Sequence, residues 1–336
     1  MLNVDRVVVA HNPVGPDDDP STSDVLAQVA AVRAGLAALG IASLPLAVEG
    51  GRAWEVLGGP GALRVPVFNL VEAPPGSPHL HTWSTVALEI LGVPFTGSSS
   101  AALWLTTDKL VTRAVLAAEG LPVAAGGRLD LDRPAVLDRV PPPWIVKPAR
   151  EDASVGLEGN PVCKTRAEAL ARGAALAHRF PGHPVLAEAF LPGRELNVSL
   201  LADGRGGVAA LPVAEIEFVD FPPDLPQVLG YEAKWLTDSF VYTHTVRRFP
   251  AEVDDGPLLA RVRELALAAF AVCGLAGYGR VDLRLDGAGE PRILEVNANP
   301  CLAADAGLMA AAAAAGLSLG QVVERILLAA LDGCSS

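Results

Sequence analysis

"RILEVNANPC", residues 292–301, decides the fold, because an apolar strand pattern ends there in polar side chains. Glu295 and Asn297 stand two positions apart, and alternate residues of a strand point to the same face. The preceding apolar run "RVDLRL", residues 280–285, is joined to it by "DGAGEP", a turn-forming segment typical of a β-hairpin. Such a hairpin would place Asp282 beside Glu295 and Asn297.

Two carboxylates and an amide oxygen at one end of a hairpin form a set of hard ligands. This set suits Mg²⁺ that is held jointly with phosphate oxygens, and the alternative is a solvated acidic face. Arg280 lies two residues before Asp282 on the same strand face, where a guanidinium would offset the charge of a phosphoryl group during transfer. The pattern therefore predicts either a magnesium–phosphate site or an exposed acidic hairpin.

The N-terminal third of the chain alternates apolar runs with amphipathic segments. We expect strands at residues 6–12, 65–70 and 93–97, and helices at 21–40 and 82–92. The β-branched run "RVVVAHN" at 6–12 is typical of a strand that is buried on both faces. This alternation predicts a parallel α/β layer.

The rest of the chain mixes helices and strands around two long loops. Helices are expected at 107–119, 165–179, 255–273 and 318–331, and strands at 144–148, 185–191, 195–203, 207–216, 279–286 and 292–296. A Gly/Ser-containing loop at 150–159 and a Pro-rich irregular stretch at 220–245 interrupt this pattern. Long loops in a compact domain are usually functional.

Length, charge and cysteine usage limit the classes of function. A chain of 336 residues is too long for one ordinary core, so two or three domains are expected. The net charge of −12 argues against a nucleic-acid partner. Four cysteines without a CxxC pair are typical of a reducing compartment. No signal-peptide pattern occurs, and the Ala-rich stretch 303–317 is too short to span a bilayer, so we expect a cytoplasmic protein without a membrane partner.

Two lysines are candidates for binding an anion. Lys147 lies in the apolar run "WIVKP", which would not bury an ammonium group without a partner. Ser154 and Gly156, in the loop that follows, offer hydroxyl and backbone donors to a phosphate. Lys109 follows good helix N-cap residues. The alternatives are an edge-strand lysine at 147 and a surface helix lysine at 109. Neither a P-loop nor a GxGxxG pattern after the first strand occurs.

In this order, these segments resemble the D-alanine–D-alanine ligase branch of the ATP-grasp superfamily. "VPFTGSSSAALWLTTDK", residues 93–109, is similar to the segment that joins the family's first domain to its nucleotide-binding pair. "IVKPAREDASVG", residues 145–156, looks like the family's phosphate-covering loop, and "YEAKW", residues 231–235, looks like its mobile loop with a phosphate-binding lysine. "GRVD…LEVNANP" looks like its metal-binding hairpin.

The resemblance implies an α/β and α+β molecule with the ATP-grasp fold. An N-terminal α/β domain would occupy residues 1–103. A central subdomain at 104–186 and a C-terminal subdomain at 187–336, which carries the metal site, would sandwich ATP. Dimers are common in the family, and the apolar first domain is compatible with a homodimer.

The resemblance also implies roles for three groups of residues. The phosphates, ribose and adenine of ATP would be held by Lys109, Lys147, Ser154, Glu188, Phe190, Leu191, Glu195 and Lys234. Catalysis would depend on Arg280, Lys234 and Ser154, with Arg280 on the phosphoryl group or the tetrahedral intermediate. Two Mg²⁺ ions, for which Mn²⁺ could substitute, would be bound by Asp282, Glu295 and Asn297.

The implied reaction joins a small-molecule carboxylate to an amine, both of them amino-acid-like. ATP would phosphorylate the carboxylate, the amine would attack the acylphosphate, and ADP, phosphate and an amide would leave. Closure of the loops at 150–159 and 220–240 would keep water from the intermediate.

Several positions depart from the family's substrate-binding pattern and point away from the cell-wall dipeptide ligase. Cys301 stands where those ligases have a glycine, and Asp305 would repel the carboxylate of a second D-alanine. Glu72 stands where they carry a histidine, and with His11 it is a candidate for substrate recognition, next to core or surface roles. Trp235 replaces a common tyrosine.

Other interpretations remain open. Asp17 to Asp19 either replace the family's glutamate that meets the first ammonium group or form a solvated turn. The chain could be a D-alanine–D-alanine ligase with an unusual pocket, or a kinase that stops at the acylphosphate. A nucleotide-binding regulator without catalysis would not need both the arginine and every metal ligand.

Overall fold

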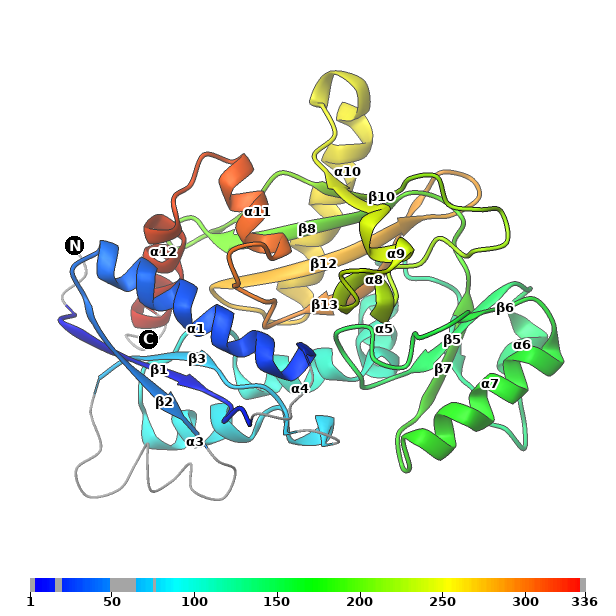
Figure 1. The fold of residues 1–336 in the computed structure, drawn as a ribbon, viewed down its shortest axis with the longest axis horizontal. Coiled ribbons are helices and arrows are strands. Elements are labelled where there is room, and N and C mark those ends of the chain that lie inside the picture. Colours follow the sequence, from blue (N-terminus) through cyan, green and yellow to red (C-terminus); the bar gives the residue numbers. More distant parts are fainter. Residues whose placement is uncertain (1–3, 16–19, 49–64, 75–76, 333–336) are drawn as a thin grey trace.

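Three β-sheets and the helices between them make up the structure (Figure 1). The computed structural model describes residues 4–15, 20–48, 65–74 and 77–332. Along the chain a three-stranded parallel sheet comes first, then a four-stranded and a six-stranded antiparallel sheet. Asp17 to Asp19 lie outside the described residues, so their role stays a prediction.

The parallel sheet has the order β2–β1–β3, with β1 (Arg6–His11) between β2 (Ala42–Ala47) and β3 (Val67–Leu70). Five of the six residues of β1 are buried, as the β-branched run predicts. Val7 and Val9 pack in one core with α1 (Pro20–Ala38). The alternate residues of β1 pack on the opposite face against α3 (Trp83–Leu91).

Two details of this region differ from the sequence prediction. β2 was not predicted, because Pro45 interrupts its pattern; the strand lies at the edge of the sheet in the described residues, where proline is tolerated. The strand expected at 93–97 is wrong, since only a bridge from Phe95 to Val67 forms there. A short helix, η2 (Pro78–Leu80), precedes α3.

The four-stranded sheet lies at the opposite end of the molecule from β2 and β1 (Figure 1). Its order β4–β7–β5–β6 involves β4 (Gly126–Arg128), β5 (Trp144–Pro148), β6 (Val162–Cys163) and β7 (Val185–Ala189). The helices α6 (Val136–Arg139) and α7 (Arg166–Arg179) share its core, and Thr165 begins α7 with a reciprocal capping box. The boundary expected between residues 186 and 187 falls within β7, and the division into domains stays a prediction.

The six-stranded sheet is built around β8 (Glu195–Ala202), which pairs with β9, β10 and β12. Its path β11–β10–β8–β12–β13 uses β10 (Ala214–Phe218), β11 (Thr245–Arg248), β12 (Tyr278–Leu285) and β13 (Pro291–Asn297), with β9 (Val208–Ala210) attached to β8. One core joins its apolar face to α4 (Ser100–Thr107), α5 (Lys109–Ala118) and α10 (Glu252–Val272). Two short helices, α8 (Tyr231–Trp235) and α9 (Phe240–Thr243), break the irregular stretch before β11.

The C-terminal helices return to the N-terminal layer. α11 (Gly307–Ala314) and α12 (Leu319–Asp332) share a core with β1 and α1 (Figure 1). α12 approaches α1 so closely that a Cβ added at Gly35 would stand 2.5 Å from Cγ2 of Val323. Glycine is therefore required at this helix crossing.

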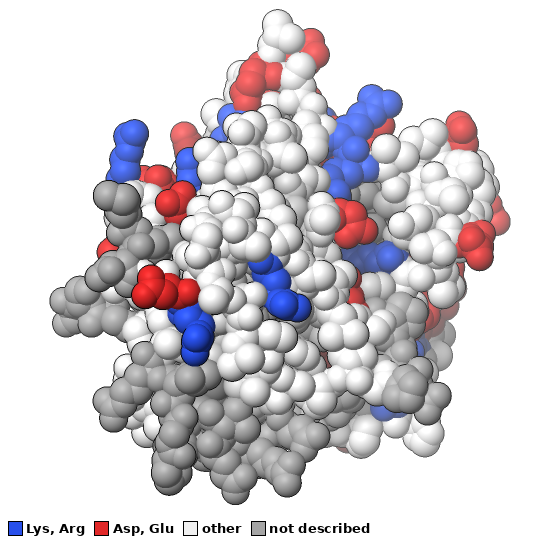
Figure 2. Space-filling model, turned by 60° about the vertical axis from the view of Figure 1, so that its left-hand side comes forward, with Lys and Arg blue, Asp and Glu red and all other residues white. Residues whose placement is uncertain are grey.

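No single helix among the described residues is long and apolar enough to cross a membrane, although α11 and α12, bent by 110°, meet the test together. On the face shown in Figure 2, charged side chains of both signs form small scattered groups around a broad uncharged surface.

Candidate active site

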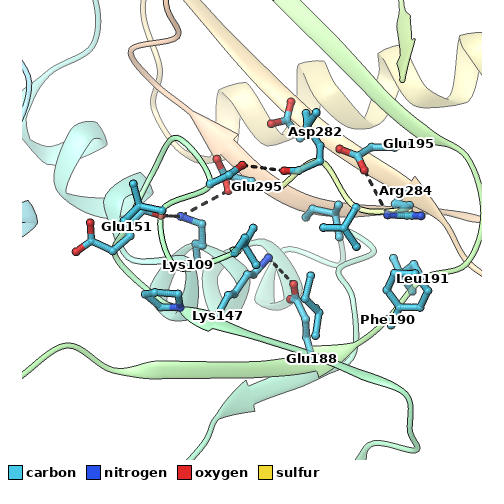
Figure 3. Close-up of a pocket in the computed structure, with 18 of the residues that line it drawn as sticks. Lys109, Lys147, Glu151, Glu188, Phe190, Leu191, Glu195, Asp282, Arg284 and Glu295 are labelled. Atoms are coloured by element: carbon cyan, nitrogen blue, oxygen red, sulfur yellow. Dashed lines mark hydrogen bonds and ion pairs between the residues drawn. The ribbon is translucent and has the colours of Figure 1, made fainter. Parts of the chain in front are cut away.

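A pocket lies between the four-stranded and six-stranded sheets (Figure 3). Its walls come from β5, β7, β8, β12 and β13 and from the two loops that follow β5 and β10. It brings together most of the nucleotide, catalytic and metal residues predicted from the sequence, namely Lys109, Lys147, Ser154, Glu188, Phe190, Leu191, Glu195, Lys234, Asp282 and Glu295. Arg280 and Asn297 contact this set through Asp282.

One end of the pocket is apolar. Phe190 and Leu191 lie at this end in Figure 3, and the pocket lining also includes the apolar side chains of Ile145, Val155, Leu157, Val228 and Leu294. Leu294 is supplied by a β-bulge, because the register of β12 and β13 shifts between Asp282 and Leu283. The bulge adds an apolar side chain one residue before Glu295, at the junction between the apolar and the charged parts.

A buried ion pair stands beside the apolar end. Arg284 Nη1 lies 3.3 Å from Glu195 Oε2, and the guanidinium stacks over the ring of Phe190 at 5.0 Å. Burial raises the pKa of Glu195, and Arg284 opposes this shift. Glu195 was predicted from the sequence, whereas Arg284 was missed, although it lies directly opposite Glu195 in the register of β12 and β8.

Two lysines cross the middle of the pocket. Lys147 Nζ lies 2.5 Å from Glu188 Oε1, and both side chains are buried. Lys109 Nζ lies 3.5 Å from Glu295 Oε2 and 3.2 Å from Asp152 Oδ1. Burial lowers the pKa of Lys109, but Glu295 and Asp152 outweigh it and raise the pKa overall. Lys109 is therefore a fully charged ammonium group and not the surface helix lysine of the alternative reading.

Local capping explains the position of Lys109. Asp108 is the N-cap of α5 and accepts hydrogen bonds from the backbone N–H groups of Leu110 and Val111. Its other carboxylate oxygen pairs with Arg150 Nε at 2.8 Å, so the start of α5 is tied to the loop after β5. The side chain of Lys109 then points from the first helical residue into the pocket (Figure 3).

The hairpin has the register that its sequence predicts. Asp282 is opposite Glu295 and Arg280 is opposite Asn297. The carboxylate of Asp282 accepts two bonds from Arg280, at 2.7 and 2.8 Å, and one from Asn297 Nδ2 at 3.2 Å. Asn197 on β8 donates a further bond at 2.9 Å. Asn197 was not predicted, although the alternation in "ELNVS" places it on the same face as Glu195.

Cations hold Glu295 in its ionised form. Burial would raise the pKa of Glu295, but Lys109, Lys147, Lys234 and Arg280 lower it to about 2. The charged form of Lys234 is disfavoured instead, because burial and the neighbouring Arg280 lower the pKa of its ammonium group. No group of three or more His, Cys, Asp and Glu side chains that could hold a metal occurs in the described part of the chain. Two carboxylates and Asn297 would thus need ligand oxygens from a bound molecule to complete a magnesium shell.

Two loops meet over the pocket. Ser154 Oγ donates to the Leu229 carbonyl oxygen at 2.8 Å, and Trp235 Nε1 donates to the Ala153 carbonyl oxygen at 3.1 Å. Gly156 has a φ of +83°, and a Cβ there would stand 2.4 Å from Cγ of Pro148. Glycine is required at this point for the loop to fold back onto β5. Trp235, which stands where the family commonly has a tyrosine, therefore contacts the loop through its indole N–H and not through a hydroxyl group.

The four residues predicted to bind substrate do not form one group: two are neighbours, one is exposed and one is buried. Glu72 and Cys301 lie near each other, since burial, Asp24 and the charge of Glu72 all raise the pKa of the Cys301 thiol. Asp305 is exposed, and its carbonyl oxygen accepts a bond from Arg247 at 3.0 Å. His11 is buried at the end of β1, where Nδ1 lies 2.7 Å from the Asn12 carbonyl oxygen.

Comparisons with known proteins place this chain in a family. Residues 132–328 match the family model described as D-ala D-ala ligase C-terminus. A D-alanine–D-alanine ligase of Bordetella avium is 36% identical over 243 residues, which are 72% of this chain and 71% of the relative. One from Laribacter hongkongensis is 38% identical over 250 residues, 74% of each chain. The chain belongs to the D-alanine–D-alanine ligase family. This member is thus a ligase, an enzyme that forms carbon–nitrogen bonds.

The fold is also shared with solved structures. The crystal structure of a D-alanine–D-alanine ligase from Bacillus anthracis complexed with ATP matches with a TM-score of 0.74, covering 98% of both chains at 19% identity. A second structure of that enzyme matches with a TM-score of 0.75. The ATP-grasp fold class predicted from the sequence is confirmed by these matches.

Proposed function

We propose that this ligase joins the carboxylate of one amino-acid-like small molecule to the amine of another at the expense of ATP, through an acylphosphate, and that it is not the housekeeping dipeptide ligase of the cell wall. The observation that carries the proposal is the polarity gradient of the pocket. Phe190 and Leu191 lie at one end, Lys147 and Lys109 lie farther along, and the ionised carboxylate of Glu295 lies beside these lysines (Figure 3).

This gradient fits a nucleoside triphosphate. The apolar end would accept adenine beside Phe190 and Leu191, with Glu195 at the ribose. Lys109 and Lys147 would exchange their present carboxylate partners for α- and β-phosphate oxygens, and Lys234 would contact the γ-phosphate. Asp282, Glu295 and Asn297 would hold Mg²⁺, which supplies neutralisation of phosphate charge when bound.

The balanced reaction has two steps. A carboxylate oxygen attacks the γ-phosphorus, the bond to the β–γ bridging oxygen breaks, and ADP leaves. The amine nitrogen then attacks the acyl carbon, the carbon–oxygen bond to phosphate breaks, and the nitrogen loses a proton. Arg280, with Lys234 beside it, would stabilise the negative charge that develops on the phosphoryl oxygens.

Water must be kept from the acylphosphate for the amine to react. The bonds from Ser154 to Leu229 and from Trp235 to Ala153 hold the two covering loops together. These contacts support a closed state in which the loops exclude solvent during both steps.

The side chains around Cys301 support a pair of substrates other than two D-alanine molecules. Cys301 donates its thiol hydrogen to Asp24 Oδ2 at 3.0 Å, and the acidic side chains of Glu72 and Asp152 lie nearby. A second D-alanine would have to place its carboxylate away from this acidic surrounding, which repels anions. The relatives' own names favour the alternative, a D-alanine–D-alanine ligase with an unusual pocket.

Release of ADP, measured with a coupled assay over pairs of amino acids, tests the proposal, and mass spectrometry identifies the amide. We expect Mg²⁺-dependent ADP and amide formation with some pair other than two D-alanines. Strong turnover with D-alanine alone would establish the dipeptide ligase instead. An absence of ADP formation with every pair, despite ATP binding, would favour the non-catalytic regulator.

A further inference from the structure

Three carboxylates from separate parts of the chain lie close enough to act on one another, since Asp152 and Asp24 both raise the pKa of Glu72. We call Asp24, Glu72 and Asp152 the acidic wall; they come from α1, from the segment after β3 and from the loop after β5. The backbone of Glu72 is fixed by Asn12, whose side chain accepts from Glu72 N at 2.6 Å and donates to Glu72 O at 3.0 Å. The position of Glu72 is thus set by the fold.

Asp24 is fixed by contacts that join α1 to the loop after β13. Cys301 Sγ lies 3.0 Å from Asp24 Oδ2, and Gln28 Nε2 lies 3.4 Å from the same oxygen. Gln28 Oε1 accepts a bond from Leu302 N at 3.2 Å. Since Cys301 and Asp282 both act on Arg280 and raise its pKa, this part of the wall borders the proposed catalytic arginine.

The acidic wall is short of positive charge. Asp152 pairs with Lys109, but this one ammonium group also serves Glu295. Neither Asp24 nor Glu72 forms an ion pair with a lysine or arginine of the described residues. Burial, Asp152 and Asp24 together raise the pKa of Glu72 to about 7, while Gln28 opposes the shift. Glu72 in turn raises the pKa of its neighbours Tyr278 and Cys301.

A histidine nitrogen beside the wall also lacks a donor. His81 Nδ1 lies 3.2 Å from Thr107 Oγ1, whose own hydrogen is donated to the Leu103 carbonyl oxygen at 2.8 Å. Nδ1 therefore carries the proton, and Nε2 is left as an acceptor. Within the described ranges this Nε2 atom is buried and has no partner, and His81 lies within the field of Asp152. A buried acceptor without a donor is costly until a ligand supplies one.

The opposite side of the substrate region is basic. Arg280 lowers the pKa of both Lys234 and Arg247, which shows that the three cations lie close together. A ligand between the two sides would turn its carboxylate toward these cations and its positive charge toward the acidic wall.

We propose that the acidic wall binds the side-chain ammonium group of a diamino acid, with Asp24 and Glu72 as its carboxylate partners and His81 Nε2 as a further acceptor. This inference rests on the proposed ligase function and names the class of one of its two substrates. A plain α-amino acid brings a single ammonium group, whereas a diamino acid adds the second positive charge that Asp24 and Glu72 lack.

Titration calorimetry with matched pairs of amino acids tests this proposal. The enzyme with Mg²⁺ and a non-hydrolysable ATP analogue is titrated with racemic diaminobutyrate, ornithine and lysine, and with their neutral counterparts aminobutyrate, norvaline and norleucine. We expect at least one cationic member to bind on the order of tenfold more tightly than its counterpart, as one charge-assisted hydrogen bond provides. Its binding at pH 7 should also release a proton as Glu72 ionises, seen as a dependence of the heat on the buffer. The proposal is overturned if no cationic member is preferred.

Two variants and a control locate the effect. Glu72→Gln and Asp24→Asn should each reduce the cationic preference to about threefold or less, and Glu72→Gln should abolish the proton release. Glu264→Gln, an exposed acid on α10, should change neither quantity. An unchanged preference in both variants would place the cation elsewhere. If ADP forms equally well with neutral amino acids, this inference fails alone; if ADP forms with no pair, the proposed ligase function fails.

Discussion

The nucleotide pocket and the acidic wall both group several carboxylates, but Asp24 and Glu72 of the wall have no cationic partner among the described residues, whereas the pocket carboxylates do. In the pocket each acid has a basic partner, in the pairs Lys147–Glu188, Arg284–Glu195, Lys109–Glu295 and Arg280–Asp282. In the wall, Cys301 and Gln28 are the side-chain hydrogen-bond donors that the described part of the chain gives to Asp24 and Glu72. The pocket is therefore electrostatically complete before a ligand arrives, whereas the wall depends on its ligand.

The pair Lys147–Glu188 gives the largest expected effect on the pocket side. Lys147→Met should lower the free energy of unfolding by about 3–5 kcal/mol, because it leaves Glu188 buried without its cation. The double variant Lys147→Met/Glu188→Leu should recover most of this loss, and both variants should lose ATP binding. Urea unfolding and calorimetry measure the two quantities. Equal stability of the single and double variants would show that Glu188 does not need Lys147.

Glu295→Gln separates catalysis from folding at the centre of the pocket. Turnover should fall at least about 100-fold, because the variant removes a carboxylate that faces the proposed magnesium and phosphates. The fold should persist, since Lys109 keeps Asp152 and the Glu151 carbonyl oxygen at 2.7 Å. The coupled ADP assay measures the loss, with the exposed Glu264→Gln as control. Unchanged turnover in Glu295→Gln would contradict the metal assignment.

Trp235→Phe tests the contact between the two loops that cover the nucleotide pocket. The ring is retained, but the bond from Nε1 to the Ala153 carbonyl oxygen is lost. We expect amide formation to fall about tenfold while ADP release falls less, because water reaches the acylphosphate through a looser cover. The ratio of ADP to amide, from the coupled assay and mass spectrometry, measures this leak. Trp104→Phe on α4, at a side chain that is 61% exposed, is the matched control and should leave the ratio unchanged. The same ratio in both variants would show that Trp235 does not hold the cover closed.

The hairpin and the lysines could be predicted from the sequence because strand alternation is a local rule. Asp282 and Glu295 face each other as "RVDLRL" and "RILEVN" require. Lys147 could be suspected because an apolar strand contained an ammonium group without a visible partner. Asn197 follows the same alternation, yet an asparagine in a strand attracts no attention until Asp282 is known to lie opposite.

The acidic wall could not be predicted in the same way. Asp24 sits on a helix with an ordinary apolar pattern, and only the loop after β13 gives it a partner in Cys301. Glu72 was singled out by resemblance, but its shortage of positive charge depends on Asp24 and Asp152 from two other elements. β2 was missed for a related reason, since Pro45 is tolerated only because that strand lies at the edge.

The smallest expected effect is a pH-dependent change in stability at Glu72, which tests whether the wall lacks the cations that the pocket has. Its pKa rises from 4.5 in the unfolded chain to about 7 in the fold, so the folded state binds this proton more tightly. Its contribution to stability is then full below about pH 4.5 and is lost as the pH rises through about 7. Glu72→Gln should match the parent protein in urea unfolding at pH 4.5 and exceed it by about 1 kcal/mol at pH 8, after allowance for partial exposure. The same comparison with Glu264→Gln should show no dependence on pH. Equal free energies of unfolding for Glu72→Gln and the parent at both pH values would mean that solvent already satisfies this carboxylate, and the wall would then differ from the pocket in shape but not in charge.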